Sequence, residues 1–562
     1  MRIRHFFWPA VALIVSTVAV LEFRSAMGET QTWDEGIHIS AGYSYLEFGD
    51  FTWNVEHPPL AKMAAALPLT FMNLKADRTA PDGKRKDQVA YGVDFLYKNR
   101  LHADTLLIAS RTPNILLTLA FALAIALWTR RRYGPLAGIA AAALCAFDPN
   151  LIAHGRYVTT DFPITAFFFF ACVLWVEYLE AGTLTRLLAA SIAIALALIT
   201  KFSAILLLPA LVILYAACWL RRPREFGLVR LIVAWGTVLA TVTIFVLVIY
   251  WPETLRCLHG GVPRIADLAT RNNLIGEALF RLGKRFNLPA HAYLLGLNHV
   301  ADHNAGGHAS YLLGLRSMTG WWYYFPVVFA VKSTMAALAA TLILLLAALV
   351  QAFRRQWITP MALGLALPPV LYFAFSMSSG INIGMRHILP IYPFLYVGVA
   401  AWLSERRNWQ PALYLLAALA TLQIGECTRI TPDYLAFFNE LAGGPGKGPE
   451  YLVDSNIDWG QDVKKMATWL RKTTGSTRAR VFYFGNAQMR YYGVDEVGYP
   501  EAMDQKGWDE IDELCVVSVT PLQGVYVPLD VLAQMRLREP IAKIGWSMYV
   551  YDLRKHPARS EP

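Results

Sequence analysis

A series of long apolar runs, repeated along the first 425 residues, is the strongest constraint on what this chain can fold into. Most of these runs approach the roughly 20 residues that a helix needs to cross a hydrocarbon layer about 30 Å thick. The candidate spans are Phe6–Phe23, Thr112–Trp128, Leu136–Ile152, Phe162–Leu179, Leu187–Thr200, Phe202–Leu220, Leu228–Trp251, Trp322–Val350, Ile358–Met377, Ile388–Leu403 and Pro411–Ile424. The sequence therefore predicts a mainly α-helical, polytopic membrane protein with about eleven transmembrane helices.

Composition agrees, because 56% of the residues are hydrophobic and only 16% are charged, far from the balance of a soluble globular protein. The net charge is +10. Many of the arginines occupy short connections between runs: Arg130, Arg131, Arg132, Arg186, Arg221, Arg222, Arg224, Arg230, Arg354, Arg355, Arg406 and Arg407. A cytoplasmic N-terminus puts all of them on the cytoplasmic side, as expected for short loops of membrane proteins. The charge is thus an orientation signal, and no nucleic-acid partner is needed to explain it.

The first run follows Arg2 and Arg4 as a signal peptide would, but no convincing small-residue cleavage site follows it, so it is interpreted as a retained span. Eleven spans in an inner membrane then place residues 24–111, residues 252–321 and the tail from 426 on the outward, periplasmic side. Three cysteines outside the spans, Cys257, Cys427 and Cys515, are candidates for one disulfide. Chemistry is expected on this outward side.

The first outward loop opens with Thr32-Trp33-Asp34-Glu35, directly beyond the first span. Two interpretations of Asp34 stay open at this point. It can cap the N-terminus of a short interfacial helix, or it can be a carboxylate at the membrane surface that accepts a proton from a hydroxyl. Helical spacing of apolar residues from Ile37 to Phe48 predicts an amphipathic helix lying on the bilayer, ended by Gly49-Asp50.

Further ionisable residues cluster near the same membrane boundary. The segment from Glu56 to Lys62 carries His57 and a Pro-Pro pair, which predicts an extended entry into a second short helix. A lysine such as Lys62 more often snorkels to water than binds a ligand. Arg156, Asp161, Lys201 and Arg386 also fall at outward ends of spans. Ionisable groups there are functional candidates by default, and arginine suits phosphate because its planar fork donates paired hydrogen bonds.

The order of these motifs resembles glycosyltransferase family 39, which contains the protein O-mannosyltransferases and the bacterial lipid A aminoarabinose transferases. The resemblance is carried by Trp33-Asp34-Glu35, Gly49-Asp50, His57-Pro58-Pro59-Leu60-Ala61-Lys62, Ala109-Ser110-Arg111-Thr112-Pro113, Arg156-Tyr157 and Asp161. It covers roughly residues 25–220. It implies a GT-C fold, a polyprenyl-phosphate-linked sugar as donor and an inverting transfer to an acceptor hydroxyl.

The resemblance also implies roles for single residues. Asp34 would be the general base, and Glu35 and Asp161 would position the base or the acceptor hydroxyl. Arg156 would contact the donor phosphate, with Lys62, Lys201, Arg386 and His57 as further candidates. Loop 252–321 shows no sign of the β-trefoil domain inserted in eukaryotic mannosyltransferases, so the acceptor class (protein, lipid or glycan) stays open.

No cofactor is expected to be required; a divalent cation stays open as an alternative, although the residue spacing does not support a metal site. His299, Asp302, His303 and His308 match no standard zinc pattern. Asp454, Asn456 and Asp458 resemble the start of a calcium loop, but Lys465 stands where that loop needs its bidentate glutamate. A divalent cation therefore finds no support in the spacing.

After the membrane module, residues 1–425, a Pro/Gly-rich linker over 426–449 leads into a soluble α/β domain over 450–562. Strands are predicted at Tyr451–Asp454, Val481–Gly485, Cys515–Thr520 and Ser547–Tyr551, with a helix from Gln461 to Arg471. This outward domain is expected to select or present the acceptor and to do no chemistry; the alternative is a lid that only stabilises the outward loops.

The leading hypothesis is thus a membrane glycosyltransferase. The alternative is a transporter or flippase of a lipid-linked sugar, for which broken helices, midplane charges and an inverted repeat would be expected. The charges instead gather at one face and no inverted repeat is apparent, which favours the enzyme.

Overall fold

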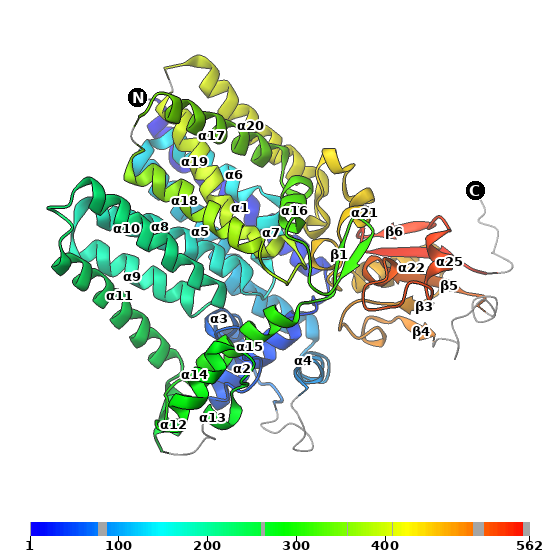
Figure 1. Cartoon of the computed structure of the whole chain (residues 1–562). Coiled ribbons are helices and arrows are strands. Elements are labelled where there is room, and N and C mark those ends of the chain that lie inside the picture. Colours follow the sequence, from blue (N-terminus) through cyan, green and yellow to red (C-terminus); the bar gives the residue numbers. More distant parts are fainter. Residues whose placement is uncertain are drawn as a thin grey trace.

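The computed structural model of the chain describes residues 2–76, 87–259, 265–356, 358–406, 408–497 and 511–554. Most elements are helices, and a small sheet domain sits at one end of the helical body, opposite the N-terminus (Figure 1). Arg407, one of the cytoplasmic arginines of the orientation argument, lies outside the described residues. The expected class, a mainly α membrane protein with a small C-terminal α/β unit, is confirmed.

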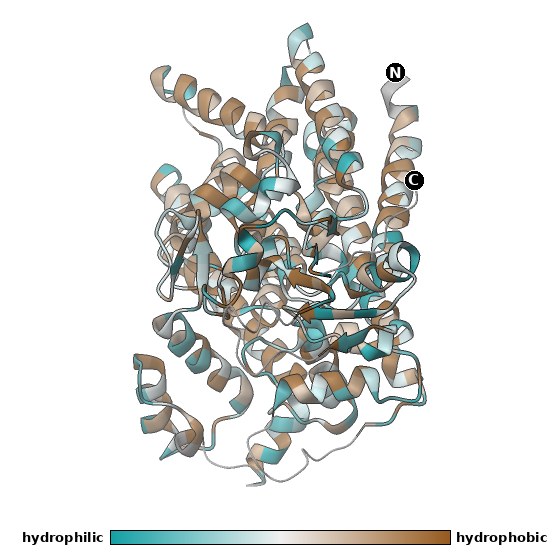
Figure 2. Cartoon of the chain, turned by 90° about the vertical axis from the view of Figure 1, so that its right-hand side faces the viewer, coloured by the Kyte–Doolittle hydropathy of each residue, from teal (hydrophilic) through white to brown (hydrophobic). Residues whose placement is uncertain are grey.

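Within the described residues, seven helical segments are long and apolar enough to cross a membrane. They are His5–Gly28, Ala103–Tyr133, Asp161–Ala181, Phe202–Arg221, Leu228–Ile249, Met335–Phe353 and Met385–Glu405. They correspond to α1 (Arg2–Gly28), α5 (Ala103–Tyr133), α8 (Asp161–Ala181), η2 with α10 (Phe202–Leu206, Leu207–Arg221), α11 (Leu228–Ile249), α17 (Met335–Phe353) and η3 with α19 (Met385–Ile391, Tyr392–Glu405). In Figure 2, hydrophobic residues, drawn brown, are frequent on the helices in the upper half of the view.

The predicted count of about eleven spans is therefore too high by the criteria of length and composition. An eighth span is reached only if α6 (Pro135–Ala146) and α7 (Pro149–Arg156), bent by 65°, count as one. Helices α9 (Leu184–Leu198) and α18 (Pro360–Ser376) are apolar but shorter. Helix α20 (Gln410–Ile430) has the length, but buried polar residues, Gln423 and Glu426, interrupt its apolar sequence. All eleven predicted segments are helical, so the difference lies in how many of them can cross alone.

The bend between α6 and α7 has a local cause. Asp148 stands in the break, and its Oδ1 accepts hydrogen bonds from the backbone N–H groups of Asn150 (2.7 Å) and Leu151 (3.1 Å). Pro149 then opens α7, a position where its missing N–H costs nothing. The new cap redirects the chain, and α7 ends at Arg156, in the layer where the outward loops meet the helices.

The first outward loop folds into short packed helices: α2 (Glu35–Phe48), α3 (Leu60–Ala66), η1 (Leu67–Phe71) and α4 (Gln88–Tyr97). The predicted pair of short helices is confirmed, and Gly49 ends α2 in the left-handed conformation (φ 62°). Helix α2 is not a surface helix, however, because residues 35–45 are all buried. A Cβ at Gly42 would lie 2.1 Å from the carbonyl oxygen of Lys62, which shows how closely α2 approaches α3.

The second outward loop holds α12 (Trp251–Leu258), α13 (Ile265–Leu268), α14 (Leu274–Gly283) and α15 (His291–Gly306), then an antiparallel pair, β1 (Ser310–Leu312) and β2 (Leu315–Ser317). Helix α16 (Tyr324–Lys332) precedes α17. In Figure 1, α12 to α14 lie at the bottom of the molecule, beyond the end of α11.

The C-terminal domain contains one five-stranded sheet in the order β4-β3-β5-β7-β6. Its strands are β3 (Arg478–Phe482), β4 (Asp495–Val497), β5 (Leu514–Ser518), β6 (Ala542–Ile544) and β7 (Met548–Asp552); β3 is parallel to β4 and β5, and β7 is antiparallel to β5 and β6. Helix α22 (Val463–Thr474) packs on this sheet through an apolar face at helical spacing, Val463, Met466, Ala467 and Leu470. Three of the predicted strands and the predicted helix overlap these elements.

The fourth predicted strand, Tyr451–Asp454, is wrong. That stretch forms the end of a short helix, α21 (Gly448–Tyr451), and the start of a 3-10 turn, η7 (Asp454–Asn456). It is buried against the helical body instead of joining the sheet: Ser455 Oγ donates to the carbonyl of Ile383 (2.7 Å), and Asn456 Oδ1 accepts from Met385 N (2.9 Å). Contacts to the membrane module thus took the place of a strand partner.

The predicted linker also packs on the helical body. Tyr434, Leu435, Phe437 and Phe438 are buried, and short turns, η4 (Tyr434–Ala436), η5 (Glu440–Ala442) and η6 (Pro445–Lys447), fold the rest. The buried amine of Lys332 donates to the carbonyls of Leu435 (2.9 Å) and Asn456 (2.6 Å). One side chain at the end of α16 therefore holds two parts of the connection to the tail.

This gives a first prediction. Lys332→Met should lower the free energy of unfolding by about 1–3 kcal/mol, because buried carbonyls lose their donor. The measurement is thermal unfolding of the purified protein in detergent. Lys98→Met is the matched control, since among the described residues Lys98 forms only an exposed pair with Asp94, worth about 0–1 kcal/mol. Equal unfolding midpoints for the two variants would show that the hydrogen bonds of Lys332 do not stabilise the connection to the tail.

Candidate active site at the outward face

Asp34 immediately precedes α2 but does not cap it. No hydrogen bond joins its side chain to the helix N-terminus. Instead its Oδ2 lies 2.8 Å from Nη1 of Arg386, and the carboxylate is 24% exposed while the guanidinium is 11% exposed. Of the two interpretations of Asp34, the cap is therefore wrong. What remains is a carboxylate at the edge of solvent, held by a cation.

Arg386 links Asp34 to a second carboxylate and, through it, to a second cation. Its Nη1 lies 3.7 Å from Oδ2 of Asp161, whose Oδ1 lies 2.6 Å from Nζ of Lys201. Asp161 opens α8, Lys201 precedes η2, and Arg386 lies in η3, so three distant segments converge. The result is a row of alternating charges, Asp34–Arg386–Asp161–Lys201, which we call the charge row.

Buried polar atoms beside the charge row lack partners among the described residues: Nε of Arg386, Nδ1 of His57 and Nε2 of His387. Burial lowers the pKa of His57 well below its usual value, and the positive charges of Lys201, His38 and Lys62 lower it further. This direction of the pKa shift favours the neutral imidazole of His57. Unsatisfied buried donors and acceptors are costly, and a polar ligand bound at this place would satisfy them.

Glu35 does not join this group. Its carboxylate accepts two hydrogen bonds from Arg111, to Oε1 (2.8 Å) and Oε2 (2.6 Å), in a fully buried pair. Backbone N–H groups of Val158 (3.0 Å) and Thr32 (2.8 Å) occupy the remaining sites. Glu35 was expected to position the base or the acceptor hydroxyl. Both of its oxygens accept hydrogen bonds from protein groups, so the structure does not support direct contact with the acceptor.

Arg156, the predicted phosphate contact, is also engaged elsewhere. It is fully buried and donates from Nη2 to Oε1 (2.8 Å) and Oε2 (2.9 Å) of Glu29, which also accepts from the hydroxyl of Tyr157 (2.9 Å). Because Nε and Nη2 donate to Glu29 and Nη1 donates to the carbonyl of Ile152, the guanidinium has no free pair of N–H groups for a donor phosphate. The sequence motif located the right neighbourhood, but it did not reveal the carboxylate that pairs with the arginine.

Lys62 lies on α3, deeper than a snorkelling lysine. Its amine donates to the carbonyl (2.6 Å) and the side-chain oxygen (2.8 Å) of Asn54 and to the hydroxyl of Tyr45 (3.0 Å). Burial lowers the pKa of Lys62 to about 7. All three donor positions are used, so we assign Lys62 to the support of the loop and not to phosphate.

The tail brings residues that the sequence analysis did not include in the site. The indole of Trp459 lies under the guanidinium of Arg386, with 4.4 Å from Cζ to the ring centroid. The carbonyl of Trp459 accepts from Trp33 N (2.9 Å), and the carbonyl of Gln461 accepts from Thr30 N (2.9 Å). Residues 30–33 and 459–461 thus hold each other, and the tail forms one wall of the site.

An aromatic stack continues this wall beside Asp34. Trp33 stacks on Phe484 (5.2 Å between centroids), which stacks on Tyr526 (5.4 Å). The hydroxyl of Tyr526 donates to Oδ2 of Asp454 (3.2 Å). Asp454 has a positive φ of 58°. Burial raises the pKa of its carboxyl, and the positive charge of Arg386 opposes that rise. The sequence signal for Asp454 was its spacing with Asn456 and Asp458, which was considered only as a calcium loop.

Among the described residues, no group of three or more metal-ligating side chains is close enough to hold an ion. Asp458 accepts from Thr520 N (3.0 Å), and Asp462 accepts from the hydroxyl of Ser547 (2.6 Å) and pairs with Lys465 (2.6 Å). Burial raises the pKa of Asp458 to about 8. These carboxyls serve the packing of the tail. The six cysteines are free, so the disulfide considered among Cys257, Cys427 and Cys515 does not form.

A second prediction separates structural from functional arginines. Arg156→Ala should lower the free energy of unfolding by about 3–5 kcal/mol, because it removes the bidentate partner of the buried Glu29 carboxylate and leaves Lys465, 3.9 Å away, as its ion-pair partner. Thermal unfolding in detergent measures this. Arg429→Ala is the control, since Arg429 pairs with Glu440 at the surface and should cost at most about 1 kcal/mol. An Arg156→Ala protein as stable as the wild type would show that Arg156 is free for a ligand.

Comparison with known proteins gives one family match. Residues 102–251 match the family model described as dolichyl-phosphate-mannose-protein mannosyltransferase. A search of the curated proteins found no match.

Among solved structures, the chain is similar to ArnT from Cupriavidus metallidurans bound to undecaprenyl phosphate, at 15% identity and a TM-score of 0.45, covering 96% of this chain and 97% of that one. It is also similar to the archaeal oligosaccharyltransferase AglB from Archaeoglobus fulgidus, in complex with an inhibitory peptide and a dolichol-phosphate. There the identity is 12% and the TM-score 0.43, covering 95% of this chain and 73% of that one. The family-model match, over residues 102–251, confirms the resemblance to the mannosyltransferase family that the sequence motifs indicated.

Proposed function

We propose that this protein is a membrane glycosyltransferase that moves a sugar from a polyprenyl-phosphate-linked donor to an acceptor hydroxyl at the outward face. The observation that carries the proposal is the charge row. It places a partly exposed carboxylate, Asp34, 2.8 Å from a guanidinium that also approaches Asp161 and, through it, Lys201. The family match over residues 102–251 supports the same class of reaction.

The donor phosphate is best placed against Arg386 and Lys201. Arg386 retains a buried Nε without a partner among the described residues, and His57 and His387 supply further unsatisfied ring nitrogens. Arginine binds phosphate through paired, charge-assisted hydrogen bonds. This arrangement replaces Arg156, the phosphate contact expected from the motif, with Arg386, which was only a further candidate.

Asp34 serves as the general base in this proposal. While Arg386 holds it, its Oδ2 is occupied by a cation. A phosphate that arrives at Arg386 competes for the same guanidinium and leaves the carboxylate free to accept a proton. Binding of the donor would thus prepare the base, and an empty site would keep it occupied.

The transfer itself is a single displacement with inversion. The acceptor oxygen attacks the anomeric carbon as Asp34 takes the hydroxyl proton. The bond between that carbon and the phosphate oxygen breaks, and the electron pair leaves with the lipid phosphate. Arg386 and Lys201 stabilise the negative charge that develops on the leaving group, the largest electrostatic demand of the step.

The cytoplasmic N-terminus and the inner membrane remain part of the proposal. They rest on the arginines of the short loops, and the structure is consistent in placing the sheet domain and the N-terminus at opposite ends (Figure 1). The sugar and the acceptor (protein, lipid or glycan) are for the assay to identify. A flippase would move the donor across the bilayer and leave the label on the lipid.

A third prediction tests the base. Asp34→Asn should reduce transfer of radiolabelled sugar from polyprenyl phosphate to envelope extract by about 10²–10⁴-fold, since that is what general-base catalysis typically contributes. Donor binding should persist. Asp94→Asn, which changes an exposed carboxylate on α4, should transfer at the wild-type rate. Near-normal turnover by Asp34→Asn would remove Asp34 from the mechanism, and label that crosses the bilayer but stays on lipid would support a flippase.

A fourth prediction tests the phosphate contact. Arg386→Ala should weaken binding of polyprenyl phosphate, and Arg386→Lys should restore only part of it, because lysine lacks the planar fork. Lipid binding to the detergent-solubilised protein, followed by native mass spectrometry, measures both. Equal affinity of the wild type and Arg386→Ala would refute the assignment. Arg111→Lys is the comparison for a buried arginine that contacts only protein, and it should change unfolding more than affinity.

A further inference from the structure

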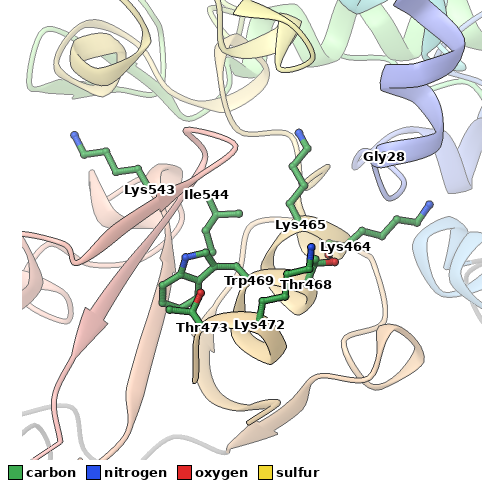
Figure 3. Close-up of a pocket in the computed structure, with 9 residues that line it drawn as sticks. All are labelled: Gly28, Lys464, Lys465, Thr468, Trp469, Lys472, Thr473, Lys543 and Ile544. Atoms are coloured by element: carbon green, nitrogen blue, oxygen red, sulfur yellow. Dashed lines mark hydrogen bonds between the residues drawn. The ribbon is translucent and has the colours of Figure 1, made fainter. Parts of the chain in front are cut away.

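A groove lies outside the charge row, at the junction of the tail and the first helix. It is an open groove of about 570 Å³ between α22, β6 and the end of α1 (Figure 3). Four lysines line it, together with Gly28 and the indole of Trp469: Lys464, Lys465, Lys472 and Lys543. We call it the lysine groove.

The position of α1 fixes the depth of the lysine groove in the membrane. Leu13, Val20 and Met27 are spaced by seven residues, so they follow one face of the helix, and they are 69%, 64% and 60% exposed. An exposed apolar face on a membrane-spanning helix faces lipid. The groove begins at Gly28, the next residue, and Lys464 Nζ donates to the carbonyl of Met27 (3.2 Å). The groove therefore lies where the hydrocarbon ends and the headgroups begin.

Two of the four lysines are already neutralised by acids. Lys464 pairs with Asp104 (2.8 Å) and Lys465 with Asp433 (2.5 Å), so their charges are balanced within the protein. They line the groove, and their ion pairs attach α22 to the helical body.

The other two lysines have no such balance. Within the described part of the chain, Lys472 makes no hydrogen bond or ion pair, and Lys543 contacts only the carbonyl of Gly446 (3.4 Å) and the ring of Tyr549 (4.8 Å to the centroid). Both ammonium groups are exposed. Between them lies Trp469, half-buried, a residue type that prefers the headgroup layer. Uncompensated positive charge and an indole at this depth suit an anionic headgroup.

We propose that the lysine groove binds the phosphate of an anionic phospholipid of the outward leaflet. Lys472 and Lys543 contact the phosphodiester, and Trp469 packs against the glycerol and the upper acyl chain. The bound lipid joins the tail to the membrane surface beside α1. The inference does not rest on the proposed transferase activity, since none of these three residues belongs to the charge row.

The experiment compares lipids on the full-length protein in detergent. Native mass spectrometry counts the phosphatidylglycerol and the phosphatidylcholine retained by the wild type and by K472E/K543E. We expect the wild type to prefer phosphatidylglycerol, and the double variant to lose about tenfold or more of that binding, because two attractive charges near the headgroup are reversed. K472R/K543R should retain it. Addition of sodium chloride should weaken it, since the charges are exposed.

The matched control is K98E/K284E, which reverses two exposed lysines away from the groove and should bind as the wild type does. Unfolding midpoints and sugar transfer should match the wild type in all variants, so loss of the fold and loss of the transferase are scored separately. Three results would overturn the proposal: no preference for phosphatidylglycerol, equal retention by K472E/K543E, or displacement of the lipid by an equal concentration of inorganic phosphate. The last would show a site for free phosphate.

Discussion

The buried pair of Glu35 and Arg111 is the interaction on which the outward site depends. The carboxylate comes from the start of α2, and the guanidinium comes from the first third of α5. The guanidinium also donates to the carbonyls of Ala26 and Thr30, each at 2.7 Å, at the exit of α1. A buried carboxylate is tolerated only when it is paired and fully hydrogen-bonded, and here every oxygen is used. Asp34 is the neighbour of this fixed point, which leaves its own carboxylate little freedom except toward Arg386.

Competition for Arg386 gives the charge row its functional logic. One guanidinium serves two acids within the protein, at 2.8 Å and 3.7 Å, while Trp459 covers its face at 4.4 Å. A third anion must displace one of these contacts. The longer distance belongs to Asp161, which keeps Lys201 at 2.6 Å in any case. Asp34 has no second cation within salt-bridge distance among the described residues, so the proposed binding of a phosphate at Arg386 would change its environment most.

Much of the fold was predictable because its causes are local. Apolar runs located the helices, Gly49 marked the end of α2, and the Pro-Pro pair marked the entry to α3. The number of helices able to cross alone was not predictable in the same way. That number depends on contacts with other elements, which the sequence of a single segment does not show. Examples are the break at Asp148, the short helices α9 and α18, and the buried polar residues of α20. The same holds for Tyr451–Asp454, where burial against the membrane module replaced strand pairing.

The site shows the same division. Asp34, Asp161, Lys201 and Arg386 were named from their depth and charge, and the structure brings them together. Arg156 and Glu35 were named for the same reasons, but their partners, Glu29 and Arg111, are 127 and 76 residues away in the chain. Charge at a boundary identifies a residue that must be paired; it does not say whether the partner is protein or ligand. Only the long-range contacts decide that.

The backbone hydrogen bonds between residues 30–33 and 459–461 have a consequence for biosynthesis. The loop that carries Asp34 is made early, and its partner segment, residues 459–461, is made after all the predicted spans. Contacts this distant in sequence form late, because the chain between them must be ordered before they can close. A partly synthesised or wrongly inserted chain therefore lacks one wall of its site. Until the last hundred or so residues are made and folded, the carboxylate lacks its finished surroundings.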